Sequence, residues 1–118
     1  MTQRFLIVDD ARISRLRLRA ALEAHGPCEV EEVPNLALAR EALAAGEWTA
    51  IFCDLLLPDG DGFSLLEGLK GDGPARFVYS CRVTEETRER AKALQATFLE
   101  KPLNDEALAA VLRPLVAA

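Results

Sequence analysis

The segment TAIFCDLLLPDGDG, residues 49–62, decides the fold class of this chain. It begins with a short apolar run, and that run ends at Asp54. A turn-forming sequence around Pro58 follows. A short apolar run bounded by turn residues is typical of a buried strand. We therefore expect a strand over residues 50–53, with Asp54 at the point where the strand gives way to a loop.

Charged residues also follow two other apolar runs. Asp9 and Asp10 follow the run FLIV, and Lys101 follows the run TFLE. The carboxyl ends of parallel strands share one edge of a sheet, and ligands bind at that edge. We therefore expect these three side chains to lie close to Asp54.

Apolar runs of strand length alternate with stretches of helical periodicity through the whole chain, and Gly and Pro clusters separate them. The expected strands cover residues 5–8, 28–33, 50–53, 77–80 and 97–100, and the expected helices cover residues 12–25, 35–45, 62–70, 84–94 and 104–117. Five βα units joined by right-handed crossovers give a three-layer α/β sandwich around a parallel sheet. With 118 residues, 50% of them hydrophobic, residues 1–118 are expected to form one domain.

Composition argues against several classes of protein. The net charge of −5 disfavours a nucleic-acid surface, which needs a surplus of Lys and Arg. No stretch approaches the roughly 18 apolar residues of a membrane span, and the first residues show no signal-peptide pattern. Cys28, Cys53 and Cys81 lack metal spacing and fit reduced thiols, and we expect the last two to be small buried hydrophobes. These features predict a soluble cytoplasmic protein that binds neither nucleic acid nor membrane.

Three carboxylates at one sheet edge would need positive charge. If Asp9, Asp10 and Asp54 converge, each pair at about 4 Å repels by about 4 kcal/mol at an effective dielectric of 20. Lys101 supplies one positive charge, and a divalent cation would supply two. Carboxylate oxygens suit Mg²⁺, which also coordinates phosphoryl oxygens. Such a site would leave Asp54 as an attacking carboxylate, a route to an aspartyl phosphate.

Each of these residues has a structural alternative when it is taken alone. Paired aspartates often cap helices, and an aspartate before a turn often stabilises that turn. A lone loop lysine is usually solvated. The DGDG sequence after Pro58 is a turn and helix start rather than a calcium loop, because Phe63 and Lys70 occupy positions where ligands are needed. The joint occurrence of the charged residues at strand ends favours the phosphoacceptor interpretation.

The chain resembles, over essentially its whole length, the receiver domain of bacterial two-component response regulators. The segments that carry the resemblance are FLIVDDARISR at 5–15, DLLLPDGDG at 54–62, YSC at 79–81 and FLEKP at 98–102. It implies a flavodoxin-like (βα)5 fold with strand order 2-1-3-4-5. It also implies that a phosphohistidine on a histidine kinase or histidine phosphotransfer protein donates a phosphoryl group to Asp54. Such a domain dephosphorylates itself slowly and turns over no external substrate.

The resemblance also assigns roles to individual residues. The implied Mg²⁺ ligands are Asp9, Asp10, Asp54 and the backbone carbonyl of Leu56. Ser80 would donate a hydrogen bond to the bound phosphoryl group, and Lys101 would pair with it electrostatically.

A conformational switch follows from the same resemblance. Phosphorylation would draw Ser80 toward Asp54, and Phe98 would then fill the space that Ser80 leaves. The face of the fourth helix, fifth strand and fifth helix would change and control a partner or an output domain. The peptide bond between Lys101 and Pro102 occupies a position that is commonly cis in the family.

Three residues depart from the usual family pattern. Cys81 stands where the family usually has Ala or Gly, which narrows access to the phosphoryl pocket. Leu56 and Arg82 occupy positions that in this family commonly flank the path of the hydrolytic water. Leu cannot orient water, whereas Arg82 can hold the phosphoryl group by a charge-assisted bond. We therefore expect a comparatively long-lived phosphoform.

Two surfaces are candidates for partner binding. Arg12, Arg15 and Arg19 form a basic ridge at helical spacing. This ridge is either a docking surface for the phosphodonor or a solvated face partly paired with Glu23. The core stripe of the last helix comprises Leu108, Val111, Leu112 and Leu115. Its remaining apolar surface leaves three uses open: homodimer formation, binding of a downstream protein, or continuation into a missing output domain.

Two other functions are alternatives to the phosphoacceptor. An aspartyl-phosphate hydrolase would need an Asp-x-Asp pair at the first strand, and Asp9 and Asp10 lack that spacing. A degenerate receiver that acts as a phosphorylation-independent scaffold is disfavoured because every required position is filled. The sequence leaves the kinase, the signal and the output pathway open.

Overall fold

The computed structural model describes residues 2–69, 73–101 and 103–116. Its five long strands form one parallel sheet with the order β2-β1-β3-β6-β7. These strands are β1 (Gln3–Val8), β2 (Cys28–Val33), β3 (Ala50–Asp54), β6 (Ala75–Ser80) and β7 (Ala96–Glu100). Since β6 and β7 are the fourth and fifth long strands along the chain, the predicted order 2-1-3-4-5 is confirmed, and so is the flavodoxin-like fold class.

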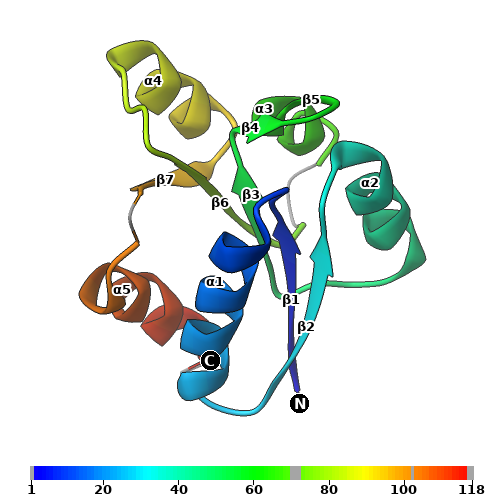
Figure 1. Cartoon of the computed structure of the whole chain (residues 1–118), viewed down its shortest axis with the longest axis vertical. Coiled ribbons are helices and arrows are strands. Elements are labelled where there is room, and N and C mark those ends of the chain that lie inside the picture. The colour runs from blue at the N-terminus through cyan, green and yellow to red at the C-terminus, as the bar shows by residue number, and fades with distance from the viewer. Residues whose placement is uncertain (1, 70–72, 102, 117–118) are drawn as a thin grey trace.

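Helices cover both faces of the sheet (Figure 1). They are α1 (Arg12–Ala24), α2 (Leu36–Ala45), α3 (Gly62–Leu66), α4 (Glu85–Ala93) and α5 (Asp105–Val116). Side chains of α1 and α5 pack in one hydrophobic cluster, and side chains of α2, α3 and α4 pack in the other. No helix within the described residues is long and apolar enough to cross a membrane.

The two clusters follow from the alternation of side chains along each strand. Phe5 and Phe52 face α1 and α5, whereas Leu6 and Ile51 face the opposite layer. Successive side chains of a strand point to opposite faces, so a strand covered on both faces must be apolar at every position. This explains why the runs FLIV and AIFC have no polar alternation and why both are fully buried.

The segment between β3 and α3 differs from the prediction. A short antiparallel hairpin, β4 (Leu56–Leu57) and β5 (Gly60–Asp61), lies where only a turn was expected. Gly60 has a φ of +145°, which favours glycine at this turn. The predicted helix over 62–70 was too long: α3 ends at Leu66, shortly before Gly68, a residue of low helix propensity. Residues 70 and 117, the predicted ends of two helices, lie outside the described residues.

Asp59 ties this hairpin to the start of α2. Its Oδ1 accepts a hydrogen bond of 2.9 Å from the N–H of Leu36, and its Oδ2 accepts one of 3.1 Å from the N–H of Ala37. The first N–H groups of a helix have no partner within the helix, and a carboxylate also interacts favourably with the positive end of the dipole. The Asp59 side chain therefore fixes the loop that follows β3.

Candidate functional site

The sheet register brings the predicted site residues to one edge. Val8 is aligned with Cys53, so Asp9, the residue after β1, lies next to Asp54, the last residue of the neighbouring strand β3. Lys101 is held at the end of β6 because its N–H donates a hydrogen bond of 2.9 Å to the carbonyl of Ser80. The residues that end four strands therefore meet at the carboxyl edge of the sheet, as parallel pairing requires.

Three carboxylates converge at this edge. Asp9, Asp10 and Asp54 each offer one carboxylate oxygen, and these oxygens lie within 4.8 Å of one another. Asp9 is fully buried and Asp54 is 8% exposed, whereas Asp10 is exposed. The first two carboxylates have therefore lost most of their hydration, and the third opens the cluster to solvent.

Lys101 supplies positive charge to the two buried carboxylates. Its Nζ is 2.9 Å from Oδ2 of Asp54 and 3.6 Å from Oδ2 of Asp9. Burial raises the pKa of Asp54 above its ordinary value, and this effect outweighs the hydrogen bond and charge of Lys101, which lower it. Burial on its own lowers the pKa of Lys101, but the hydrogen bond and charge of Asp54 raise it above its ordinary value. Burial outweighs the ion pair at Asp54, whereas the ion pair outweighs burial at Lys101, because the Lys101 side chain keeps more contact with water than the Asp54 side chain does.

The donor set fits a magnesium ion. With all three carboxylates ionised, the cluster carries three negative charges against the single positive charge of Lys101. Carboxylate oxygens within a few ångströms of one another, with one side open to solvent, suit a cation that prefers oxygen ligands and retains water. The geometry of Asp9, Asp10 and Asp54 is therefore consistent with the predicted Mg²⁺ site.

Leu56 and Ser80 flank Asp54. The N–H of Leu56 donates a hydrogen bond of 3.2 Å to Oδ1 of Asp54, and the Leu56 side chain is 65% exposed. Ser80 is buried, and its Oγ accepts a hydrogen bond of 3.1 Å from the N–H of Arg82. Two roles stay predictions: the carbonyl of Leu56 as a metal ligand, and the Ser80 hydroxyl as a hydrogen-bond donor to the bound phosphoryl group.

Phe98 packs on the face of the sheet that α2, α3 and α4 cover. It is half-buried on β7, opposite Val78 of β6, and packs against the cluster beneath α2, α3 and α4. This position is under the face predicted to change on phosphorylation, and the switch role of Phe98 stays a prediction. The predicted cis peptide after Lys101 falls on residue 102, which lies outside the described residues.

The prediction for the cysteines was wrong at one position. Cys53 is fully buried, and burial raises the pKa of its thiol strongly. Cys81 is exposed, because it follows the end of β6 rather than lying within the strand. Its neighbour Arg82 is also exposed.

Gly62 allows the close approach of α3 to Asp54. A Cβ atom at Gly62 would collide with the backbone carbonyl oxygen of Asp54 and would lie 2.9 Å from Sγ of Cys53. The N–H of Gly62 also donates a hydrogen bond of 2.8 Å to the carbonyl of Leu55. Gly62 therefore helps to set the backbone position of Asp54.

One contact of the site was missed from the sequence. The hydroxyl of Tyr79 donates a hydrogen bond of 2.9 Å to Oδ2 of Asp9. Burial, followed by the charge of Asp9, raises the pKa of Tyr79 well above its ordinary value, so the hydroxyl keeps its proton. The sequence offered one signal for this contact: Tyr79 lies in a strand that is buried on both faces, and a buried tyrosine hydroxyl usually needs a hydrogen-bond partner.

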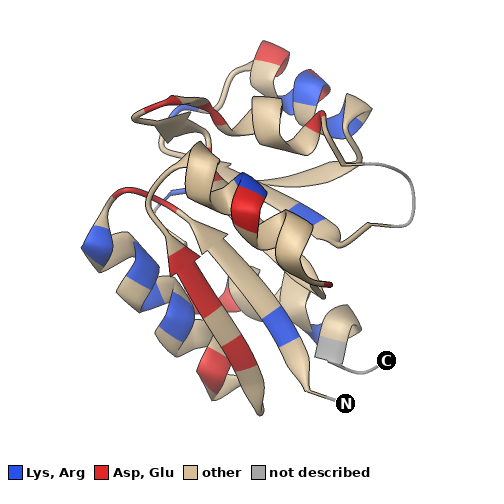
Figure 2. Cartoon of the chain, turned by 90° about the vertical axis from the view of Figure 1, so that its right-hand side faces the viewer, with Lys and Arg blue, Asp and Glu red and all other residues tan. Residues whose placement is uncertain are grey.

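The basic ridge of α1 is largely neutralised within the chain. Arg15 lies 3.2 Å and Arg19 2.7 Å from carboxylate oxygens of Glu32, and Arg19 is also 3.6 Å from Glu23. Figure 2 shows the basic positions of α1 beside acidic positions on the edge strand β2. This pairing favours the solvated-face interpretation for these two residues, whereas Arg12 is exposed at the start of the helix.

A model of the response regulator receiver domain family matches residues 5–113. The chain belongs to this family. The resemblance inferred from the strand-end motifs is therefore confirmed.

The chain is similar in sequence to a known response regulator and similar in fold to solved receivers and response regulators. Response regulator MprA of Mycobacterium tuberculosis is 30% identical over 119 residues, which cover 98% of this chain and 51% of MprA. A two-component response regulator from Clostridium difficile has a TM-score of 0.89 at 22% identity, covering 98% of this chain and 97% of the other. The beryllofluoride-activated NtrC4 receiver domain dimer has a TM-score of 0.86 at 26% identity, covering 95% and 94%. This receiver chain spans about half the length of MprA.

Proposed function

We propose that this receiver domain accepts a phosphoryl group on Asp54 from a phosphohistidine donor in a Mg²⁺-dependent reaction. The observation that carries the proposal is the convergence of Asp9, Asp10 and Asp54 within 4.8 Å, with Nζ of Lys101 at 2.9 Å from Asp54. A structural ion pair would not need three carboxylates around one lysine, two of them buried.

Asp9, Asp10, Asp54 and the backbone carbonyl of Leu56 would hold the Mg²⁺ ion. When bound, Mg²⁺ neutralises part of the negative charge of the cluster and coordinates an oxygen of the incoming phosphoryl group. An ion at this position also explains how a dianionic phosphoryl group can approach an acidic pocket.

Asp54, Lys101 and Ser80 each have a separate role in the phosphoryl transfer. A carboxylate oxygen of Asp54 attacks phosphorus while the P–N bond of the phosphohistidine breaks, and the departing imidazole nitrogen keeps the electron pair. Lys101 pairs with a phosphoryl oxygen once Asp54 has given up its negative oxygen to the new bond. The Ser80 hydroxyl turns from Arg82 to donate to another phosphoryl oxygen. The domain is modified once and turns over no external substrate.

The output of the proposed reaction is a change in the face formed by α4, β7 and α5. Movement of Ser80 toward the phosphoryl group would open space on β6, and Phe98 lies on the adjacent strand β7. The half-buried Phe98 ring would turn inward and alter the surface beneath α4.

The proposed partners follow from this chemistry. A histidine kinase or a histidine phosphotransfer protein supplies the phosphoryl group, and a downstream protein or an output domain reads the altered face. The NtrC4 receiver is described as a dimer in its beryllofluoride-activated form, which supports homodimer formation as one readout. The cytoplasm stays the predicted location. The scaffold alternative is not favoured, because the acidic cluster and Lys101 are both in place.

A beryllofluoride titration followed by NMR tests the proposal, because this anion mimics a phosphoryl group on an aspartate. Signals near Asp54 and at Phe98 should shift in the wild type with Mg²⁺. Asp54→Asn and a sample with chelator should show neither change. A folded wild-type protein whose spectrum ignores beryllofluoride and Mg²⁺ would contradict the proposal.

A further inference from the structure

The side chain of Tyr79 reaches the acidic cluster from β6. Its hydroxyl donates a hydrogen bond of 2.9 Å to Oδ2 of Asp9. Both side chains are buried, with 1% exposure for Tyr79 and 0% for Asp9. The other oxygen of Asp9, Oδ1, accepts a hydrogen bond of 2.8 Å from the N–H of Ala11. Since a buried hydroxyl and a buried carboxylate both need partners, each fixes the orientation of the other.

Lys101 lies close to the same oxygen of Asp9. Its Nζ is 3.6 Å from Oδ2 of Asp9 but 2.9 Å from Oδ2 of Asp54, so its hydrogen bond goes to Asp54. The ammonium group also lies 4.9 Å from the centroid of the Tyr79 ring, within the range of a cation–π contact. Tyr79 therefore satisfies Asp9 with its hydroxyl and supports Lys101 with its ring.

We propose that Tyr79 is a positioning residue of the phosphoacceptor site: its hydroxyl holds Asp9 in place and leaves Lys101 for Asp54. The inference rests on the proposed function, because the placed groups matter only if Asp9 binds the metal and Lys101 pairs with the phosphoryl group. Without the hydroxyl, Oδ2 of Asp9 loses its nearest donor and draws Lys101 toward itself. Asp54 then loses part of its positive partner, and Asp9 is less well aimed at the metal.

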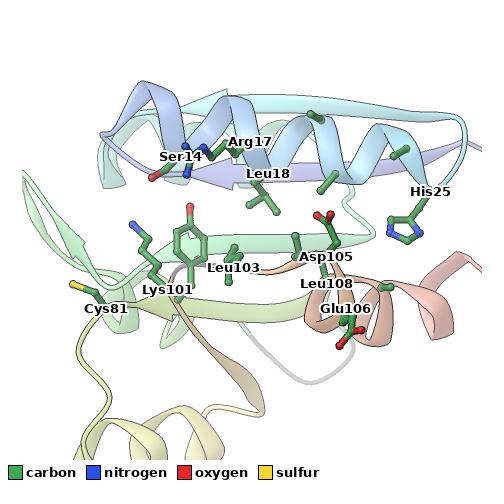
Figure 3. A pocket seen from close by; sticks show the side chains of 15 residues that line it. Ser14, Arg17, Leu18, His25, Cys81, Lys101, Leu103, Asp105, Glu106 and Leu108 are labelled. Atoms are coloured by element: carbon green, nitrogen blue, oxygen red, sulfur yellow. The ribbon is translucent and has the colours of Figure 1, made fainter.

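The surroundings of Tyr79 determine which substitution is informative. A cavity of about 990 Å³ lies between α1 and α5, and Tyr79 forms part of its wall. Figure 3 shows Lys101 and Cys81 at one end of this cavity and His25 at the other. Loss of the ring would let water from the cavity reach Asp9 and replace the hydroxyl. Tyr79→Phe is the sharper variant, because it removes the hydroxyl and keeps the ring.

The hydrogen bond can be observed directly, because Tyr79 is the one tyrosine of the chain. Labelling with [ζ-¹³C]tyrosine therefore gives a single NMR signal. In the metal-free protein, Asp9→Asn should shift this signal, since an amide oxygen is a weaker acceptor than a carboxylate. Asp10→Asn removes a neighbouring charge, leaves the hydrogen bond intact and should shift it less. An unchanged signal in Asp9→Asn would overturn the inference.

The effect on the site is measured in a mutant cycle. Tyr79→Phe should weaken Mg²⁺ binding in calorimetry and slow phosphorylation by acetyl phosphate, each by about tenfold, as expected for one lost hydrogen bond to a charged group. In an Asp9→Asn background, where only the weaker amide acceptor remains, the same substitution should have a much smaller effect. The matched control is Phe77→Leu, on the same face of β6 and in the same cluster as Tyr79. This control should lower stability and leave both quantities unchanged.

The outcomes separate this inference from the proposed function. If the wild type binds Mg²⁺ and is phosphorylated, and Tyr79→Phe does both equally well, the inference is overturned and the proposed function stands. An effect of Tyr79→Phe that is undiminished in the Asp9→Asn background also overturns it, because the effect would not pass through Asp9. A wild type that neither binds Mg²⁺ nor accepts a phosphoryl group overturns the proposed function and this inference with it.

Discussion

Asp54 is the last residue of β3 and Asp59 lies at the turn of the hairpin that follows it, and their surroundings act on them in opposite directions. Asp54 is 8% exposed, and burial raises its pKa even though Lys101 lies 2.9 Å away. Asp59 is exposed, and hydrogen bonds from the N–H groups of Leu36 and Ala37 lower its pKa. The ionised form is thus disfavoured at Asp54 and favoured at Asp59.

The difference shows how a carboxylate can be reserved for chemistry. Asp59 has donors that match its charge, so ionisation stabilises the fold and anchors the loop to α2. Asp54 shares Lys101 with Asp9 and has a second like charge, Asp10, within 4.8 Å. The unbalanced charge leaves Asp54 with binding capacity for a metal ion or a phosphoryl group, at some cost to the stability of the metal-free fold.

Removal of Lys101 should have the largest effect on this contrast. Lys101→Met leaves two buried carboxylates without their cation. The loss should lower the free energy of unfolding by about 3 kcal/mol in chelator at neutral pH, at the low end for a broken buried pair because Lys101 is partly exposed. Urea denaturation measures this loss.

The difference in unfolding free energy between Lys101→Met and the wild type should shrink in mildly acidic buffer, where Asp54, with its raised pKa, takes up a proton. Lys92→Met, at an exposed lysine of α4, is the control and should change little; equal losses in the two variants would contradict the assignment.

Gly62→Ala tests the backbone that carries Asp54. The new Cβ would collide with the Asp54 carbonyl oxygen, so the backbone must shift. We expect a loss of about 2 kcal/mol in the free energy of unfolding, typical of overpacking, together with weaker Mg²⁺ binding. Gly68→Ala provides the comparison, because its Cβ would meet only ordinary contacts, the nearest at 3.5 Å. Unaltered metal affinity in Gly62→Ala would mean that α3 does not set the position of Asp54.

Leu56→Asn tests the expected long life of the phosphoform. The exposed Leu56 side chain lies beside Asp54 and cannot orient water. An amide at this position should align the hydrolytic water and accelerate loss of the phosphoryl group by about tenfold, which corresponds to about 1.4 kcal/mol in the barrier. Decay of the phosphorylated mass after removal of the donor measures the rate. Leu38→Asn, at another exposed leucine, should leave the lifetime unchanged. A wild-type phosphoform that decays rapidly and is not accelerated by Leu56→Asn would refute the expectation.

Asp59→Asn should have the smallest effect, and pH reveals it. Because the pKa of Asp59 is lowered in the folded state, its contribution is present above the ordinary aspartate pKa and is lost as pH falls below about 4. The melting temperature of Asp59→Asn should therefore be slightly below that of the wild type at neutral pH, and the two should approach each other in acid. A difference that is constant across this range would show that the charge of Asp59 contributes nothing.

Local signals in the sequence were sufficient for the strands and for the main charged residues. Asp54 follows an uninterrupted apolar run and Lys101 follows the strand segment ATFLE, and a parallel sheet brings such strand ends together whatever their separation in the chain. The order of the strands came from the family resemblance, since periodicity alone does not determine which strands are neighbours.

The features that were missed depend on tertiary contacts. The bond between Tyr79 and Asp9 joins residues 70 positions apart, and no local pattern indicates where a buried hydroxyl finds its acceptor. The pairing of Arg15 and Arg19 with Glu32 likewise depends on how α1 lies against β2. The exposure of Cys81 follows from the exact residue at which β6 ends, and strand ends are the least certain feature of a sequence pattern.

The most direct test of the account is the intact mass of the protein after incubation with acetyl phosphate and Mg²⁺. Wild type and Asp59→Asn should each gain one phosphoryl group. Asp54→Asn should gain none, and chelator should abolish the gain in every variant. A gain that persists in Asp54→Asn, or a folded wild type that gains nothing with Mg²⁺ present, would contradict the assignment of Asp54 as the phosphoacceptor.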